Sequence, residues 1–216
     1  MSRLLDALAA STPTPGGGSV TALAGAMAAA LAAMIFRVAL ARPAASGGVS
    51  PEQQGERLRQ GLQDAEALRQ ELAQLATADA LAYAAVLDAY RLPRDSAAEQ
   101  AARTRAIQSA LRKATATPLE IAERLHTLLA VLRAAADARV ASAQADVAVG
   151  TLLAQAALQG VALTAQANLP TIEDTGFRAT VQSKLDRLIG PPTTAEGQFP
   201  VGVTPASNDR QRGADR

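Results

Sequence analysis

Residues 12–19 read Thr12-Pro13-Thr14-Pro15-Gly16-Gly17-Gly18-Ser19, and an apolar run from Val20 to Phe36 follows them directly. Each proline disfavours helix at the residue before it, so the approach to the glycines is expected to be extended. The glycines permit backbone conformations that other residues avoid. Ser19 is a favourable helix-capping residue, and the Ala-, Leu- and Met-rich run behind it favours helix. The stretch therefore predicts a glycine-rich turn leading into a buried helix over about 19–41, which ends before Pro43 and Gly47-Gly48.

Such a turn exposes backbone N–H groups at the positive end of a helix, which attracts carboxylates, phosphates and other electron-rich groups. The motif does not match the familiar phosphate-binding loops. A P-loop needs Lys-Ser/Thr after its last glycine, where this chain has Val20-Thr21, and a Rossmann loop needs a preceding strand. The glycines also fit a tight turn that lets two helices pack closely. The motif alone leaves ligand binding and packing open.

Composition restricts the fold class and several kinds of chemistry. The 216 residues suffice for one sizeable domain, and they are 49% hydrophobic but only 2% aromatic. An alanine- and leucine-rich chain suits closely packed helices and disfavours a β-sandwich. The balance of 21 basic and 20 acidic residues gives no argument for nucleic acid or membrane binding, and the absence of cysteine excludes disulfides and thiolate catalysis. The run over 20–36 is shorter than the roughly 20 residues of a bilayer span, so we expect a buried core helix.

Helical periodicity continues along the chain, and no segment reads as a strand. The proline-, glycine- and threonine-rich residues from Gly190 to Arg216 predict a disordered tail. We predict an all-α bundle of long antiparallel helices over residues 1–189. The expected helices are 3–10, 19–41, 51–90, 95–115, 117–136 after a restart or kink at Thr117-Pro118, 140–169 and 174–189.

Asp79 is the first candidate for a catalytic residue. It lies four residues after Leu75 and four before Tyr83, on the apolar stripe of the helix over 51–90. A carboxylate there either pairs with an arginine of a neighbouring helix or acts as a general acid/base whose pKa burial has raised. Periodicity leaves both interpretations open. His126, the only histidine, lies among leucines and is expected to have a structural or surface role. The sequence alone assembles no metal cluster around His126, and no metal site is predicted.

Several segments, in order, resemble the cyclodeaminase/cyclohydrolase family. Residues 13–26 resemble its opening motif, and residues 79–83 (Asp-Ala-Leu-Ala-Tyr) resemble its Asp-Ala-x-Ala-Phe segment, which carries an aspartate regarded as essential. Residues 89–94 are similar to Ala-x-x-Leu-Pro-Lys, with arginine in the last place. Residues 103–111 and 117–119 follow the family's order and spacing, and Asn168-Leu169 with Asp174 resembles its closing segment. The resemblance extends over about residues 3–189.

This resemblance implies a cytoplasmic helical homodimer that binds folate in a cleft, with neither nucleic acid nor membrane as a partner. It implies one-carbon chemistry on tetrahydrofolate, by ammonia loss or by hydrolysis of the methenyl bridge, without a metal or any cofactor beyond the folate substrate. Asp79 is the expected catalytic residue. The residues expected to bind substrate are Gly16, Gly17, Gly18 and Ser19 as hydrogen-bond donors, Arg94 and Arg103 at the anionic glutamate end, and Asn168.

The chain departs from the family pattern at a few places. Arg139-Val140 occupy the position of a frequent Gly-Asn, Ala145 replaces a hydroxyl residue before Asp146, and Thr164-Ala165 stand where Asn-Val is common. These changes bear on substrate choice and activity and leave the fold prediction intact. They motivate an alternative function, a catalytically degenerate helical dimer that binds folate or a protein partner.

Overall fold

The computed structural model describes residues 2–42 and 50–189, and within these ranges it contains helices and turns but no strand. The prediction of an all-α fold is confirmed. The predicted helix end at Pro43 and Gly47-Gly48 and the predicted tail from Gly190 lie outside the described residues. The elements are α1 (Ser2–Ala9), α2 (Gly17–Leu40), α3 (Pro51–Tyr90), α4 (Ala97–Asp137), the 3-10 helix η1 (Ala141–Ala143), α5 (Gln144–Asn168), the 3-10 helix η2 (Leu169–Thr171) and α6 (Thr175–Ile189).

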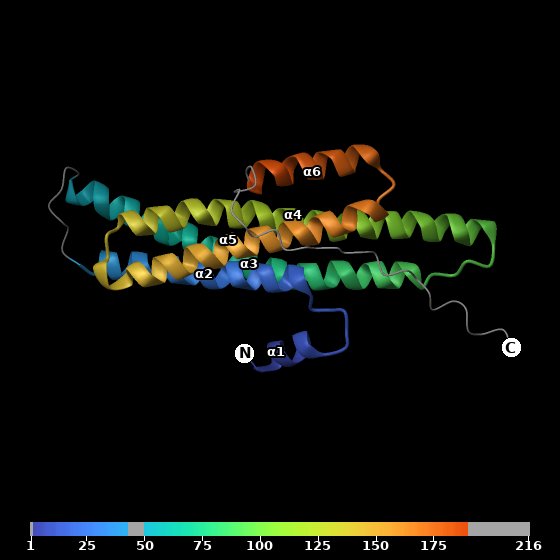
Figure 1. Ribbon diagram of the computed structural model, residues 1–216, viewed down its shortest axis with the longest axis horizontal. Helices are drawn as coiled ribbons and strands as arrows, with labels where there is room; N and C mark the ends of the chain where they lie inside the picture. Colours follow the sequence, from blue (N-terminus) through green and yellow to red (C-terminus); the bar gives the residue numbers. More distant parts are fainter. Residues whose placement is uncertain (1, 43–49, 190–216) are drawn as a thin grey trace, which may run out of the picture.

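Helices α2 to α5 run alternately in opposite directions and form the body of the bundle (Figure 1). Helix α2 packs mainly against α3 and α5, and α4 packs against the same two helices from the other side. Helix α6 lies along α4, whereas α1 stands apart from the bundle at the end of an extended connection (Figure 1). The predicted antiparallel arrangement of long helices is confirmed.

Small residues let α2 approach its neighbours closely. A β-carbon added at Gly25 would collide with Leu125 and lie 3.1 Å from Leu72 Cδ1, and one added at Gly61 of α3 would meet the Phe36 ring. The alanine-rich composition is therefore used for close helix packing, as the sequence predicts. Five alanines of α2 have no exposed surface, namely Ala22, Ala28, Ala29, Ala32 and Ala33.

Two long helices begin at the caps that their sequences predict. The Ser50 hydroxyl accepts a hydrogen bond from Gln53 N at 3.2 Å, and Pro51 occupies the first helical position of α3. Ser96 and Glu99 form a reciprocal capping box at the start of α4. The predicted range of 51–90 matches α3 at both ends.

Of the predicted restart or kink at Thr117-Pro118, the restart is wrong, because α4 continues through Pro118 as one helix from Ala97 to Asp137. A proline inside a helix has no N–H and leaves the carbonyl four residues earlier without its helical donor. Here that carbonyl belongs to Ala114, and it accepts a hydrogen bond of 3.1 Å from Asn168 Nδ2 at the end of α5. A side chain from another helix thus replaces the missing backbone bond.

Helices α3 and α4 extend beyond the start of α2 and the end of α5 (Figure 1). Their extension has a small core of its own, formed by Ala82, Val86, Ala89, Ile107, Leu111, Ala114 and Ile172. Tyr83 and Tyr90 lie on the predicted apolar stripe of α3 but are 41% and 46% exposed, since α2 does not reach far enough to cover them. The fold therefore has a step where four packed helices become two.

Two stretches, Gly17–Leu40 and Ala141–Thr171, are long and apolar enough to cross a membrane by length and composition alone. In the fold both stretches pack against the other helices of the bundle. Each also carries apolar side chains that face outward, among them Met27 at 50% exposure on α2 and Leu152 at 66% on α5.

Candidate active site

A pocket of about 200 Å³ lies at the step in the bundle. Helix α2 begins there and α5 ends there, so the pocket receives residues from all four helices of the bundle body and from the connection after α1. The lining consists of Pro13, Thr14 and Gly16 from the connection, Gly17 and Gly18 from α2, Asp79 and Tyr83 from α3, Ala114 from α4, and Thr164 and Asn168 from α5.

Gly18 brings the α2 backbone against the carboxyl group of Asp79. A β-carbon at residue 18 would overlap this group, lying 2.6 Å from both Cγ and Oδ2 of Asp79. The neighbouring Gly17 faces Thr164, whose Oγ1 would be 3.6 Å from an added β-carbon. Glycine at residue 18 is thus required by the close approach of a carboxylate, which sequence reasoning could not distinguish from close helix packing.

Ser19 does not cap α2, contrary to the prediction. The helix begins at Gly17 with Gly16 as its N-cap, and Ser19 lies inside the first turn with 2% of its surface exposed. Its Oγ lies 2.9 Å from the Ala76 carbonyl oxygen and 3.0 Å from Asp79 Oδ2. The hydroxyl therefore joins the start of α2 to the middle of α3, a partner sixty residues away in the sequence.

Asp79 is partly buried, and burial raises its pKa above the ordinary value of 3.8, although hydrogen bonds from the Ser19 side chain and backbone act in the opposite direction. No arginine or lysine in residues 2–42 or 50–189 forms an ion pair with it. Of the two interpretations of Asp79, the structure therefore contradicts the buried ion pair. A carboxyl group with a raised pKa at a pocket wall is suited to proton transfer near neutral pH.

Comparison with known proteins identifies the family of the chain. The family model for formiminotransferase-cyclodeaminase matches residues 1–187 of the chain. The protein belongs to this family. The chain is 34% identical over 185 residues to a methenyltetrahydrofolate cyclohydrolase from Methylorubrum extorquens, and the match covers 86% of each protein. It is 30% identical over 180 residues to a formimidoyltransferase-cyclodeaminase from Rattus norvegicus, but it spans only 32% of that longer protein.

A solved structure in the formiminotransferase-cyclodeaminase family has the same fold. The crystal structure of a formiminotetrahydrofolate cyclodeaminase from Thermotoga maritima superposes with a TM-score of 0.73 at 26% sequence identity, and the match covers 87% of both chains. The chain thus matches a cyclohydrolase in sequence and a cyclodeaminase in fold, and the fold does not decide between the two activities.

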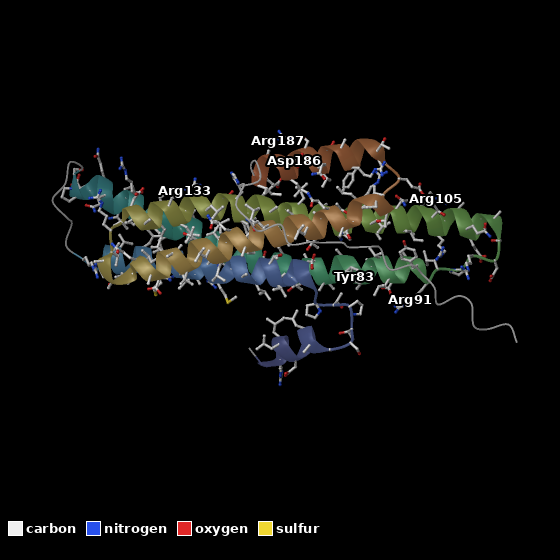
Figure 2. The ribbon with its side chains drawn as sticks, in the orientation of Figure 1. Tyr83, Arg91, Arg105, Arg133, Asp186 and Arg187 are labelled. Carbon is white, nitrogen blue, oxygen red and sulfur yellow. The ribbon has the colours of Figure 1, made fainter. Side chains whose placement is uncertain are left out.

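The pocket unites five of the eight residues that the sequence predicts for the site, namely Gly16, Gly17, Gly18, Asp79 and Asn168. Ser19 is not among the lining residues, but its hydroxyl is hydrogen-bonded to Asp79. Arg94 and Arg103 lie elsewhere in the chain, near the turn between α3 and α4. From Asp79 to the end of α3 at Tyr90 the helix rises by about 16 Å. Figure 2 shows Tyr83 and, further along the same helix towards this turn, Arg91.

Arg103 is engaged at the end of α3. Its Nε and Nη2 donate to the Tyr90 carbonyl oxygen at 3.3 and 3.0 Å, and its guanidinium lies 5.7 Å from the centre of the Tyr90 ring. Arg94 is exposed, and its carbonyl oxygen accepts a hydrogen bond from Gln100. Their assignment to the anionic end of a folate stays a prediction, because that end would lie outside the pocket.

Pocket residues that sequence reasoning did not assign to the site are Pro13, Thr14, Tyr83, Ala114 and Thr164. Tyr83 follows Asp79 by one helical turn, so its position on the pocket side was accessible from periodicity. Thr164 is the one departure from the family pattern that lies in the pocket, and its hydroxyl donates to the Gly160 carbonyl oxygen at 3.2 Å.

Ala165 is the buried neighbour of Thr164, whereas the departures at Arg139, Val140 and Ala145 lie far from this pocket. Arg139 follows the end of α4, and a helical rise over residues 144–164 places the start of α5 about 30 Å from Thr164. Arg139 has a φ of 49°, in the left-handed region that glycine adopts most readily, which explains why a glycine is frequent there. Asp146 lies in the first turn of α5, where the helix dipole favours an acidic residue.

Two further candidates have structural roles. His126 Nδ1 lies 3.0 Å from the Leu188 carbonyl oxygen and joins α4 to α6, so the predicted structural or surface role is confirmed. Asp174 accepts a hydrogen bond of 2.9 Å from Phe177 N at the start of α6 and pairs with Arg112 at 3.1 Å. Both residues hold α6 on α4.

Proposed function

We propose that the protein hydrolyses the methenyl bridge of 5,10-methenyltetrahydrofolate and that Asp79 is the general acid/base. The observation that carries this proposal is a partly buried carboxyl group with a raised pKa and no cationic partner among the described residues, placed in a pocket against the start of a helix. The match to a methenyltetrahydrofolate cyclohydrolase over 86% of both proteins supports hydrolysis as the first candidate reaction.

The pocket volume suits one end of the substrate. Ligand pockets commonly measure roughly 300–1,000 Å³, so a pocket of about 200 Å³ encloses part of an extended folate. The reacting bridge between N5 and N10 lies next to the pterin ring, and that end must therefore enter. The bridged amidinium carries a positive charge, which an ionised Asp79 attracts in a setting of reduced dielectric.

In the proposed reaction the Asp79 carboxylate takes a proton from water as the water oxygen forms a bond with the methenyl carbon. The bond between this carbon and N5 then breaks, the carboxyl group returns the proton to N5, and the remaining hydroxyl proton leaves to solvent as the formyl C=O forms. The sum is the addition of one water molecule and the release of one proton, which leaves a neutral product with a formyl group on N10. The same carboxyl group acts first as base and then as acid, and a pKa raised by burial makes it a better base than an exposed aspartate.

Cyclodeamination is the second candidate, supported by the Thermotoga maritima structure and the longer mammalian relative. In that reaction N10 attacks a formimino carbon on N5 and ammonia leaves after protonation. Asp79 would supply the proton to the leaving nitrogen. The two reactions thus need the same carboxyl group, and Thr164 is the pocket residue whose departure from the family pattern bears on the choice.

The direct test is an absorbance assay of the purified protein with each substrate. Methenyltetrahydrofolate should lose its characteristic absorbance faster than in buffer, and formiminotetrahydrofolate should be turned over more slowly or not at all. Turnover of the formimino compound alone would reverse the order of the two candidates. Folate binding in calorimetry without turnover of either compound would instead support the catalytically degenerate dimer.

The active form in this proposal is a cytoplasmic homodimer that uses the outward side of α2 and α5. Val20, Met27 and Met34 on α2 are exposed, as are Leu152 and Leu163 on α5, and residues 17–36 contain no charged side chain. Burying such a surface against a second copy removes apolar area from water. Light scattering should give twice the chain mass, and Met27→Asp should shift it to the monomer, whereas Met27→Leu should not.

A further inference from the structure

The Ser19 hydroxyl has two acceptors within hydrogen-bond distance but only one proton. The Ala76 carbonyl oxygen lies 2.9 Å from Oγ, and Asp79 Oδ2 lies 3.0 Å from it on the other side. A serine hydroxyl donates one hydrogen bond and can accept through its lone pairs. It therefore cannot donate to both neighbours at once, and the direction of each bond depends on whether Asp79 carries a proton.

When Asp79 is ionised, its Oδ2 is an acceptor only, and the Ser19 proton must point to it. The Ala76 carbonyl then keeps its place in the hydrogen-bond ladder of α3, because it belongs to the interior of a continuous helix. When Asp79 is protonated, its O–H donates to Ser19 Oγ, and the Ser19 proton turns to the Ala76 oxygen. Each protonation state of the carboxyl group has a complete set of partners.

We propose that Ser19 is a positioning residue whose hydroxyl turns between Asp79 and the Ala76 carbonyl as Asp79 loses and gains its proton. It keeps the carboxyl group in one place through both halves of a proton transfer. Gly18 holds the backbone against the same carboxyl group, so the side chain is confined from two sides. The role of Ser19 in turnover rests on the proposed function, whereas its effect on the titration of Asp79 does not.

Few other charged or titratable groups lie where they could change the titration of Asp79. Within the described part of the chain, the pocket lining has one titratable group besides Asp79, which is Tyr83 on the same helix. Residues 17–36 of α2 and 147–168 of α5 carry no charge. On α4 the charged residue closest in sequence to the lining is Lys113, next to Ala114. A change in the titration of Asp79 after a change at Ser19 is therefore attributable to this hydroxyl.

The first experiment compares Ser19→Ala with Thr21→Val. Thr21 lies on the same helix, and its hydroxyl donates to the Gly18 carbonyl oxygen at 2.8 Å. Thr21→Val therefore removes one hydroxyl hydrogen bond from the same turn of α2, but not one made to Asp79. Hydrogen bonds to an ionised acceptor are roughly twice as strong as neutral ones, so losing Ser19 disfavours the carboxylate more than the acid. In Ser19→Ala the rising limb of the kcat/KM–pH profile should shift to higher pH by roughly one unit. At a given pH on that limb, kcat/KM should then be about tenfold lower than in the wild type. Thr21→Val should leave it in place.

The second experiment needs no turnover. Carbon NMR of protein with labelled aspartate carboxyl groups follows the titration of Asp79, and the resonance missing from Asp79→Asn identifies it. Ser19→Ala should raise its midpoint. If Ser19→Ala does not fold, as judged by circular dichroism, Ser19→Cys preserves the volume and should shift the midpoint in the same direction by less. An unchanged midpoint in the folded variant overturns the proposal, whether or not the protein hydrolyses folate.

Discussion

The first turn of α2 and its middle use glycine in the same way for different ends. Gly18 and Gly25 lie two turns apart, and an added β-carbon would collide with another side chain at either place. At Gly25 the obstacle is Leu125, a fully buried core side chain, with Leu72 close by. At Gly18 it is the carboxyl group of Asp79. The close approach of the α2 backbone thus allows core packing at Gly25, in the middle of the helix. At Gly18, in its first turn, it confines the carboxyl group of Asp79.

The difference follows from what surrounds each contact. The middle of α2 is enclosed by α3, α4 and α5, so leucine methyl groups fill the space beside Gly25. The first turn lies at the step in the bundle, where α5 ends and a pocket opens. Sequence alone shows two glycines in an apolar helix. A substitution at each should separate the two purposes, because one should affect activity and the other stability.

The largest expected effect is the loss of activity in Asp79→Asn, which preserves the shape and removes the titrating group. General acid–base catalysis is worth about 10²–10⁴ in rate, so kcat/KM for methenyltetrahydrofolate should fall by that factor. Asp88→Asn is the matched control, since Asp88 is an exposed carboxylate of the same helix that pairs with Arg91. Wild-type turnover in Asp79→Asn would end the assignment of Asp79 as the acid/base.

The same variant should be more stable than the wild type at neutral pH. Because burial raises the pKa of Asp79 in the folded state, the stability present below its ordinary value of 3.8 is lost as the pH rises through the folded pKa. Asparagine avoids that loss. The difference in Tm between Asp79→Asn and wild type should be positive at pH 7 and should shrink as the pH falls towards 4. An equal Tm at every pH would contradict the raised pKa.

Gly18→Ala should reduce activity with little effect on stability. The added β-carbon overlaps the Asp79 carboxyl group, and this short side chain can rotate away only by leaving Ser19 Oγ. Displacement of a catalytic group by about 1 Å can lower the rate by about 10²-fold. We expect kcat/KM to fall by this order while Tm stays near that of the wild type. Full activity would mean that the close contact at Gly18 has no part in placing Asp79.

Gly25→Ala should show the reverse behaviour. The new methyl group meets Leu125 and Leu72 in a filled core, where overpacking destabilises by about 1–3 kcal/mol, and the better helix propensity of alanine offsets up to about 1 kcal/mol of this. Urea unfolding should show a lower free energy of unfolding, while kcat/KM of the folded protein stays at the wild-type value. Loss of activity without loss of stability would erase the distinction between the two glycines.

Patterns local to one helix allowed most of the fold to be predicted. The apolar period and the start of the helix over 51–90 at its proline are each complete within a few residues, and the structure has them. The position of Asp79 on an apolar stripe was visible for the same reason. What periodicity could not give was its partner, because that depends on which helix lies opposite.

The errors concern residues whose preferred local role was replaced by a distant contact. Ser19 has the propensity of an N-cap, but its hydroxyl bonds to Ala76 and Asp79 on another helix. Pro118 has the propensity to end a helix, but Asn168 satisfies the carbonyl that it leaves free. Both bonds are made between helices, so neither leaves a mark on the spacing of apolar residues that predicts the helices themselves.

The smallest expected effect is the coupling between Asn168 and Pro118, which both determine the donor to the Ala114 carbonyl. Asn168→Ala in the wild-type background leaves this carbonyl without a donor, which should lower stability by about 1–3 kcal/mol. In Pro118→Ala the new backbone N–H can bond to the Ala114 oxygen, so adding Asn168→Ala should then lower stability much less. Urea unfolding of the two single variants and the double variant should give a coupling of about 1 kcal/mol. Additive effects would show that the two residues act independently.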